Sequence, residues 1–221
     1  MNAKKIAAEK AVEKIENDMI VGLGTGSTAY WAIVKIGERI KEGLRIKAVA
    51  SSVRSENLAK EAGIEIIPFN KINNIDLTID GADEVDGEKN LIKGGGGALL
   101  REKILAFNSK QVYIIIDDSK FSDKLGKFPL PVEIIPFASN LTLNKLKDLK
   151  CNAVIRQLDN KLYKTDNGNL IADCDFYEIA DPEGLNSRIH LIPGVVETGL
   201  FPGAMVTSVI IGYENEKIDI L

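Results

Sequence analysis

The chain has 221 residues, of which 45% are hydrophobic and 27% are charged, and its formal net charge is −4. This composition is typical of a globular protein with an apolar core, and the acidic balance argues against a surface that binds nucleic acid. The sequence shows neither an apolar run of the roughly 18 residues that cross a membrane nor a secretory signal. We therefore expect a cytoplasmic protein whose two cysteines, Cys151 and Cys174, are reduced.

The first half of the chain alternates between helical and strand-like patterns. Apolar residues at helical spacing predict helices, and short apolar runs predict buried strands. In chain order we expect a helix over residues 3–16, a strand over 19–23, a helix over 27–40, a strand over 46–50, a helix over 55–62, strands over 64–68 and 75–79, a helix over 98–108 and a strand over 111–116. This alternation predicts a Rossmann-like α/β fold, with a doubly wound and mostly parallel sheet covered by helices on both faces.

The pattern changes near residue 129, where prolines become frequent. The segments that follow are a strand over 132–136, a helix over 141–149, strands over 152–157 and 170–175, a helix over 181–191 and a strand over 195–201. This β-α-β-β-α-β order is the split βαβ motif of ferredoxin-like domains. We expect residues 130–203 to form a small α+β domain inserted into an α/β catalytic domain made of residues 1–129 and 204–221. A β-prone run over 206–213 is expected to return to the first sheet.

The loop from Gly22 to Thr28 lies between a predicted strand and a predicted helix. Its backbone N–H groups and the start of the helix favour an anion. A dinucleotide fingerprint beginning at Gly22 would need a glycine where Ser27 stands, and no Walker lysine follows. The loop therefore predicts a phosphate monoester site, with a tight turn capped by threonine and serine as the alternative.

An acidic loop over residues 80–86 follows another predicted strand. Its spacing does not fit a calcium-binding EF-hand frame. A solvated acidic turn is one explanation. However, Asp80 and Asp83 come at the carboxyl end of an apolar strand, where open α/β sheets bind their ligands.

Four consecutive glycines, Gly94 to Gly97, follow Lys93 and precede Glu102 in the first turns of a predicted helix. Glycine is costly to order, so such a run indicates bare backbone lying against a ligand. A further loop after a strand carries Lys120, a possible clamp for a phosphate or a substrate oxygen. A parallel sheet would bring all of these loops to one edge, which predicts a site for a small anionic substrate with a carboxylate base.

The single histidine, His190, stands in an apolar context. One histidine supports neither a histidine-rich zinc site nor a serine–histidine triad, since no nucleophile-elbow motif accompanies it. We therefore expect no metal, no cofactor and a carboxylate base.

Taken together, these motifs resemble the ribose-5-phosphate isomerase A family over the whole chain. The matching segments are Gly22–Thr28, Asp80–Glu84, Lys93–Gly96 with Ala98–Leu99, Arg101–Lys103, Asp118–Lys120 and Pro193–Phe201. The resemblance implies an intramolecular oxidoreductase that interconverts D-ribose 5-phosphate and D-ribulose 5-phosphate through an enediolate. It places that reaction in the non-oxidative pentose phosphate pathway and implies a homodimer or a dimer of dimers.

The resemblance also assigns roles to residues of this chain. Glu102 is implied to be the base, with Asp80, Asp83 and Lys93 completing the catalytic set, and Lys4 is suggested to lie near the phosphate. The implied substrate-binding residues are Thr25, Gly26, Ser27, Thr28, Asp80, Gly81, Ala82, Asp83, Lys93, Gly94, Gly95, Gly96 and Lys120.

Three other functions fit parts of the sequence. A CoA transferase would use Glu102 as a nucleophile. A non-catalytic sugar-phosphate sensor of the same fold would need no base, although the chain has no spare length for a DNA-binding segment. A sugar-phosphate deaminase would more naturally use a histidine in a loop.

Overall fold

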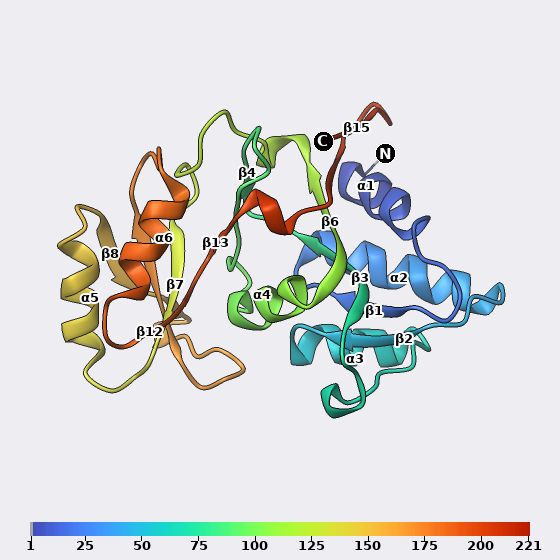
Figure 1. The fold of residues 1–221 in the computed structure, drawn as a ribbon, viewed down its shortest axis with the longest axis horizontal. Helices are drawn as coiled ribbons and strands as arrows, with labels where there is room; N and C mark the ends of the chain where they lie inside the picture. Colours follow the sequence, from blue (N-terminus) through green and yellow to red (C-terminus); the bar gives the residue numbers. More distant parts are fainter. Residues whose placement is uncertain (1) are drawn as a thin grey trace. The chain divides into compact units, whose positions relative to one another are not determined.

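A computed structural model describes residues 2–221 of the chain, which divides into two compact units (Figure 1). The first unit comprises Met1–Ala82, Arg101–Phe121 and Ala204–Leu221, and the second comprises Asp83–Leu100 and Ser122–Gly203. The inserted domain predicted over residues 130–203 lies within the second unit. No helix among residues 2–221 has the length and apolar character needed to span a bilayer.

The first unit contains a six-stranded sheet with helices packed against it. Its elements in chain order are α1 (Ala3–Val12), β1 (Ile20–Leu23), α2 (Ser27–Lys41), β2 (Lys47–Ala50), α3 (Val53–Glu61), the 3₁₀ turn η1 (Phe69–Lys71), β3 (Ile75–Gly81), α4 (Leu99–Phe107, which enters this unit at Arg101), β6 (Ser109–Asp117), the 3₁₀ turn η2 (Asp118–Lys120), β14 (Ser208–Gly212) and β15 (Ile218–Ile220). The predicted Rossmann-like architecture is confirmed for this unit, because helices alternate with strands that are mostly parallel.

The order of the strands creates a place for a ligand. They follow the order β15-β14-β6-β3-β1-β2, and every neighbouring pair is parallel except β14 and β15. From β1 the chain moves outward to β2 and then returns to β3 on the other side of β1. Open α/β sheets bind ligands at such a reversal, outside the carboxyl ends of the strands. The loop after β1 and the end of β3 therefore lie where a ligand is expected.

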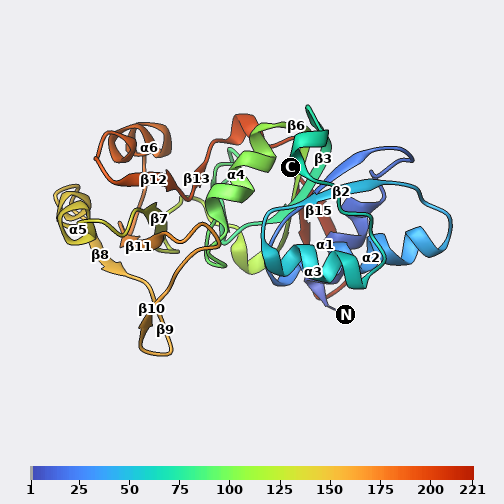
Figure 2. The same ribbon diagram turned by 90° about the horizontal axis from the view of Figure 1, so that it is seen from below.

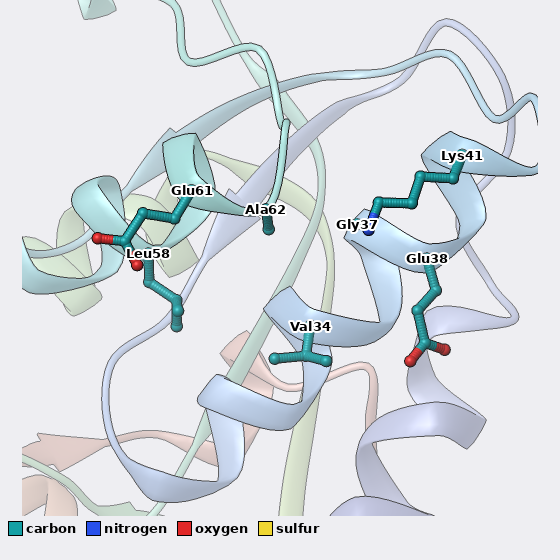
Figure 3. A pocket seen from close by; sticks show the side chains of 7 residues that line it. All are labelled: Val34, Gly37, Glu38, Lys41, Leu58, Glu61 and Ala62. Atoms are coloured by element: carbon teal, nitrogen blue, oxygen red, sulfur yellow. The ribbon is translucent and has the colours of Figure 1, made fainter.

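Apolar helix faces cover both sides of this sheet. On one side, the three helices α1, α2 and α3 each contribute a residue to one apolar cluster: Ala11, Ile33 and Ala59. These side chains pack against Val21 of β1 and Leu77 of β3. On the other side, Leu105 of α4 packs with Val49 and Ile75 and with the η1 region. Helices α2 and α3 also border a groove of about 300 Å³ (Figure 3). None of the predicted site residues lines that groove.

The second unit holds the predicted split βαβ motif. Its elements are β7 (Leu130–Ile134), α5 (Ser139–Lys147), β8 (Asn152–Ile155), β11 (Leu170–Asp175), α6 (Pro182–His190) and β12 (Val195–Thr198). The strands are antiparallel in the order β12-β7-β11-β8, which is the ferredoxin-like arrangement (Figure 2). Leu146 of α5 and Ile189 of α6 are both buried in the apolar core of this sheet.

Several short elements complete the second unit. They are a three-stranded sheet of β4 (Glu84–Val85), β5 (Leu91–Ile92) and β13 (Leu200–Phe201), a hairpin of β9 (Gln157–Leu158) and β10 (Lys161–Leu162), and the 3₁₀ turn η3 (Gly203–Met205, which ends in the first unit). The small sheet flanks the glycine run, because Lys93 directly follows β5.

Two predicted strands differ from the observed ones. Residues 64–68 form only a single parallel bridge, between Ile66 and Ala48, in which the Ala48 N–H donates to Glu65 O and the Ile67 N–H donates to Ala48 O. The next donor in this register would be the Phe69 N–H, but Phe69 already begins the 3₁₀ turn η1. The strand predicted over residues 195–201 is divided at Gly199 into β12 and β13, which belong to different sheets. The Gly199 N–H donates to Pro131 O and its carbonyl accepts from the Lys93 N–H, so the backbone changes partners at that point.

Candidate active site

The loop after β1 lies directly against Asp80 at the end of β3. A side chain at Gly24 would overlap the Asp80 carboxyl group, so glycine is required for this approach. Asp80 is only 2% exposed, and its Oδ1 accepts hydrogen bonds from the Thr25 N–H at 3.1 Å and the Gly81 N–H at 2.7 Å. These donors help to offset the cost of burying a carboxylate. The structure thus brings together two predicted site segments of the first unit.

A cluster of hydroxyl groups fixes the conformation of this loop. Thr25 Oγ1 lies 2.8 Å from Ser51 Oγ, 2.9 Å from Ser52 Oγ and 3.2 Å from Ser55 Oγ. Ser55 Oγ in turn donates to Gly24 O at 2.7 Å. The three serines follow β2 and begin α3, so the loops after β1 and β2 are joined at the same edge of the sheet. Sequence reasoning assigned no role to these serines.

The start of α2 presents hydrogen-bond donors beside a lysine. Gly26 precedes the helix with a φ of +110°, a conformation that favours glycine. Both Gly26 and Ser27 are exposed. Lys4 Nζ lies 3.1 Å from Ser27 Oγ and 3.8 Å from Asp117 Oδ2. A helix N-terminus with a nearby ammonium group is suited to binding a phosphate.

Glu102 and Lys120 also belong to the first unit. Glu102 lies in the first turn of α4 and is 4% exposed, which agrees with the predicted helix. Lys120 ends η2, the short turn that follows β6, and is partly exposed. Glu102 therefore lies near the start of a helix, whereas Lys120 lies at the end of a short turn.

The second unit places Asp83 against the glycine run. The Gly95 N–H donates to Asp83 Oδ2 at 2.7 Å, and the Asp83 N–H donates to Ile92 O at 2.9 Å. Lys93 is 2% exposed, and its Nζ lies 5.5 Å from the centre of the Phe201 ring. The run therefore connects an aspartate and a lysine that were both predicted to be catalytic.

The carbonyl groups of the glycine run also have partners. Arg156 donates to Gly94 O and Gly95 O, and Tyr163 donates to Gly96 O. Sequence reasoning missed both residues, because they lie about sixty positions from the run and form no local motif with it.

The carboxylates of two other acidic residues close to Asp83 in the sequence accept hydrogen bonds from backbone N–H groups. Glu84 is 2% exposed and accepts from the N–H groups of Gly126, Lys127 and Phe128 at 3.0 to 3.3 Å. Asp86 accepts from the Asn90 side chain and from backbone N–H groups of its own turn. These two carboxylates therefore hold loops in place.

Potential metal ligands are scattered through the described part of the chain. Within residues 2–221, no three histidine, cysteine, aspartate or glutamate side chains are grouped so that they could hold a metal ion. His190 Nδ1 lies 2.9 Å from Asn186 O, and its Nε2 lies 3.0 Å from Glu197 Oε1. These contacts fit a structural role for the only histidine.

Comparison with known proteins gives one consistent family. The model of the ribose 5-phosphate isomerase A (phosphoriboisomerase A) family matches residues 47–216. Ribose-5-phosphate isomerase A of Bacillus mycoides is 50% identical over 216 residues, covering 97% of this chain and 97% of the relative. The protein of the same name from Thermoplasma acidophilum is 52% identical over 203 residues, covering 90% of this chain and 84% of the relative.

Solved structures show the same similarity. Ribose 5-phosphate isomerase A from Methanocaldococcus jannaschii superposes with a TM-score of 0.93 at 38% identity, covering 99% of this chain and 97% of the other. A D-ribose-5-phosphate isomerase in complex with phospho-erythronic acid superposes with a TM-score of 0.95 at 38% identity, covering 100% of this chain and 99% of the other.

Proposed function

The chain belongs to the ribose 5-phosphate isomerase A family, and we propose that Glu102 is the base with which it interconverts D-ribose 5-phosphate and D-ribulose 5-phosphate. The observation that carries this assignment is the buried position of Glu102 in the first turn of α4, directly after the glycine run. Family membership also decides in favour of the isomerase over a CoA transferase, a sugar-phosphate deaminase and a non-catalytic sensor.

The reaction needs one base that acts twice. The Glu102 carboxylate takes the proton from C2 of the open-chain aldose, and the electrons of the C2–H bond form a C1–C2 double bond. The carbonyl oxygen on C1 then carries the negative charge of an enediolate. Return of the proton to C1, with transfer of the hydroxyl proton from O2 to O1, gives the ketose. The burial of Glu102 supports its role as the base, because it limits exchange of the transferred proton with bulk water.

Lys93 and the two aspartates are proposed to manage the oxygen atoms of the sugar. The Lys93 ammonium stabilises the enediolate oxygen as its charge develops. Asp80 and Asp83 accept and return hydroxyl protons during ring opening and during transfer between O1 and O2. The support for this division is that backbone N–H groups fix each aspartate through one named oxygen.

The phosphate group is proposed to bind at the start of α2. Thr25, Gly26, Ser27 and Thr28 supply N–H and hydroxyl donors there, and Lys4 and Lys120 supply positive charge. The support is the exposure of Gly26 and Ser27 and the contact of Lys4 with Ser27. Gly81, Ala82 and the backbone of Gly94 to Gly96 complete the proposed substrate-binding set.

The assembly and the location of the protein are also proposals. We propose a homodimer or a dimer of dimers, as the resemblance implies, which light scattering on the purified chain will test. We propose the cytoplasm as the location, supported by Cys151 and Cys174, which are buried and not joined by a disulfide. Fractionation of cells that make the protein will test it.

The test of the base is the change Glu102→Gln, assayed with ribose 5-phosphate in the presence of EDTA. The amide keeps the shape of the side chain but cannot take a proton at C2. We expect kcat to fall by about 10²–10⁴, while phospho-erythronic acid still binds. The matched control is Glu61→Gln, a change at an exposed glutamate of α3. Turnover near the wild-type value in Glu102→Gln would refute the assignment, whereas an inactive wild-type protein would refute the isomerase function.

A further inference from the structure

Arg156, which directly follows β8, has a guanidinium group that Asp173 of β11 holds rigidly. Arg156 Nε donates to Asp173 Oδ2 at 2.9 Å, and Nη2 donates to Oδ1 at 2.5 Å. The two side chains are only 14% and 23% exposed. Such a two-point pair fixes the plane of the guanidinium, which a lysine could not do in the same way.

The third nitrogen of Arg156 reaches the glycine run. Nη1 donates to Gly94 O at 2.8 Å and to Gly95 O at 3.1 Å. The Arg156 guanidinium also lies 5.8 Å from the centre of the Tyr163 ring, and the Tyr163 hydroxyl donates to Gly96 O at 3.3 Å. Burial raises the pKa of Tyr163 above its ordinary value, so the hydroxyl keeps the proton that it donates.

The Gly94–Gly95 peptide group connects Arg156 to Asp83. Its carbonyl oxygen accepts from Arg156, and its N–H donates to Asp83 Oδ2 at 2.7 Å. The two groups point to opposite sides of a planar trans peptide, so fixing the carbonyl also fixes the direction of the N–H. A positive charge at the carbonyl polarises the peptide and strengthens the bond that its N–H donates.

This peptide needs partners from outside the run, because glycine lies on both sides of it. Gly94 has a φ of +107°, and a side chain on Gly95 would come within 2.5 Å of Asp83 Oδ1. The run therefore cannot be stiffened with larger residues where it meets Asp83. Glycine backbone rotates at little steric cost, so the orientation of the peptide depends on its hydrogen bonds.

We propose that Arg156 is a positioning residue for the isomerase reaction, which holds the Gly94–Gly95 peptide so that its N–H orients the Asp83 carboxylate. Asp173 acts one step further away by fixing the guanidinium. This inference rests on the proposed role of Asp83. Neither Arg156 nor Asp173 needs to touch the sugar.

The test compares Arg156→Gln with Arg188→Gln, a control at an exposed arginine of α6 in the same unit. We expect Arg156→Gln to lower kcat for ribose 5-phosphate by between about tenfold and about 10²-fold, the cost of a misplaced group. KM should change much less than kcat, since no contact with the phosphate is removed. Arg188→Gln should match the wild type in both constants.

Three further measurements separate positioning from folding. Arg156→Lys keeps a donor for Gly94 O but loses the two-point pair with Asp173, so it should recover part of kcat. Tyr163→Phe removes only the bond to Gly96 O and should lower kcat by less than Arg156→Gln does. The thermal midpoint of each variant reports the loss of stability independently of kcat.

The outcomes are distinct. An inactive wild-type protein would mean that the proposed function fails, whatever Arg156 does. Full kcat per folded molecule in Arg156→Gln, even with a lowered thermal midpoint, would overturn the positioning role. If Arg156→Gln does not fold, Arg156→Lys decides: a reduced kcat at unchanged KM supports the role, and wild-type constants overturn it.

Discussion

Strand β3 carries an aspartate near each of its ends, and the two have different surroundings. At the amino end, Asp76 accepts from the Ile20 N–H at 2.8 Å and from Lys110 Nζ at 2.7 Å. At the carboxyl end, Asp80 accepts from the N–H groups of Thr25 and Gly81. The donors to Asp76 therefore include a charged side chain on β6. The Thr25 and Gly81 donors to Asp80 are backbone groups, and they lie at the edge of the sheet where the strand order reverses.

This difference matches the roles that we propose for the two aspartates, which are stability at the amino end of the strand and chemistry at its carboxyl end. Asp76 joins β1, β3 and β6. The hydrogen bond from the Ile20 N–H has the larger effect and the one from Lys110 the smaller, and both hold the pKa of Asp76 below its ordinary value. Asp80 faces a loop in which Gly24 has no side chain, which leaves room for the carboxyl group and for the approach of the backbone. Gly24 therefore allows the loop after β1 to approach the carboxyl end of β3, where we propose that Asp80 acts.

The largest effect that separates the two ends is expected from Asp80→Asn. The amide oxygen can still accept from Thr25 and Gly81, so we expect the fold to persist, but the side chain can no longer take up a hydroxyl proton. We expect kcat to fall by about 10²-fold or more, in the range of lost acid–base catalysis, with a small change in thermal midpoint. Steady-state kinetics and a melting curve measure both. Equal loss of kcat in Asp76→Asn would remove the distinction.

The same substitution at the amino end, Asp76→Asn, should lower stability by about 1 kcal/mol and leave kcat per folded molecule unchanged. Because folding depresses the pKa of Asp76, its stabilisation is present above the ordinary aspartate pKa of about 4 and is lost as pH falls through the lower folded value. Urea unfolding at neutral pH and near pH 3 will measure this. A stability difference that is as large at the acidic pH as at the neutral one would contradict the account.

The smallest effect is expected from Lys110→Gln, which removes the ammonium partner of Asp76 but leaves the Ile20 N–H in place. Lys110 is 61% exposed, so the loss should be about 0.2–1 kcal/mol. It should shrink further in high salt, because exposed charges are screened. Denaturation at low and high salt measures the change. A cost larger than that of Asp76→Asn would show that the ion pair, and not the backbone hydrogen bond, dominates at this end.

The ends of strands and the order of the larger elements could be predicted from the sequence. The apolar run before Asp80 and the glycine-rich turn after β1 marked the carboxyl ends of two strands, and the β-α-β-β-α-β order marked the ferredoxin-like part. The two-residue strands β4, β5 and β13 are too short for any periodicity to show. Residues 64–68 carried a strand-like pattern, but they form only one bridge, because the chain enters η1 at Phe69.

The hydrogen bonds that hold the candidate site residues in place could not be predicted from the sequence in the same way. Ser51, Ser52 and Ser55 meet Thr25 only because β1 and β2 are neighbours in the sheet. Arg156 meets Gly94 only after the chain has folded back across 62 positions. Local patterns record which side chains a segment offers, whereas these hydrogen bonds depend on which segments the fold brings together.

The central claim, that Glu102 moves a proton between C2 and C1, can be tested by following that proton directly. Ribose 5-phosphate deuterated at C2 is incubated in ordinary water with the wild type or with Glu102→Gln, and both carbons are followed by NMR. With the wild type, we expect deuterium to leave C2 and to appear partly at C1 and partly in water. With Glu102→Gln, we expect release from C2 to slow by about 10²–10⁴. Release of deuterium from C2 at the wild-type rate in Glu102→Gln would refute the role of Glu102 as the base.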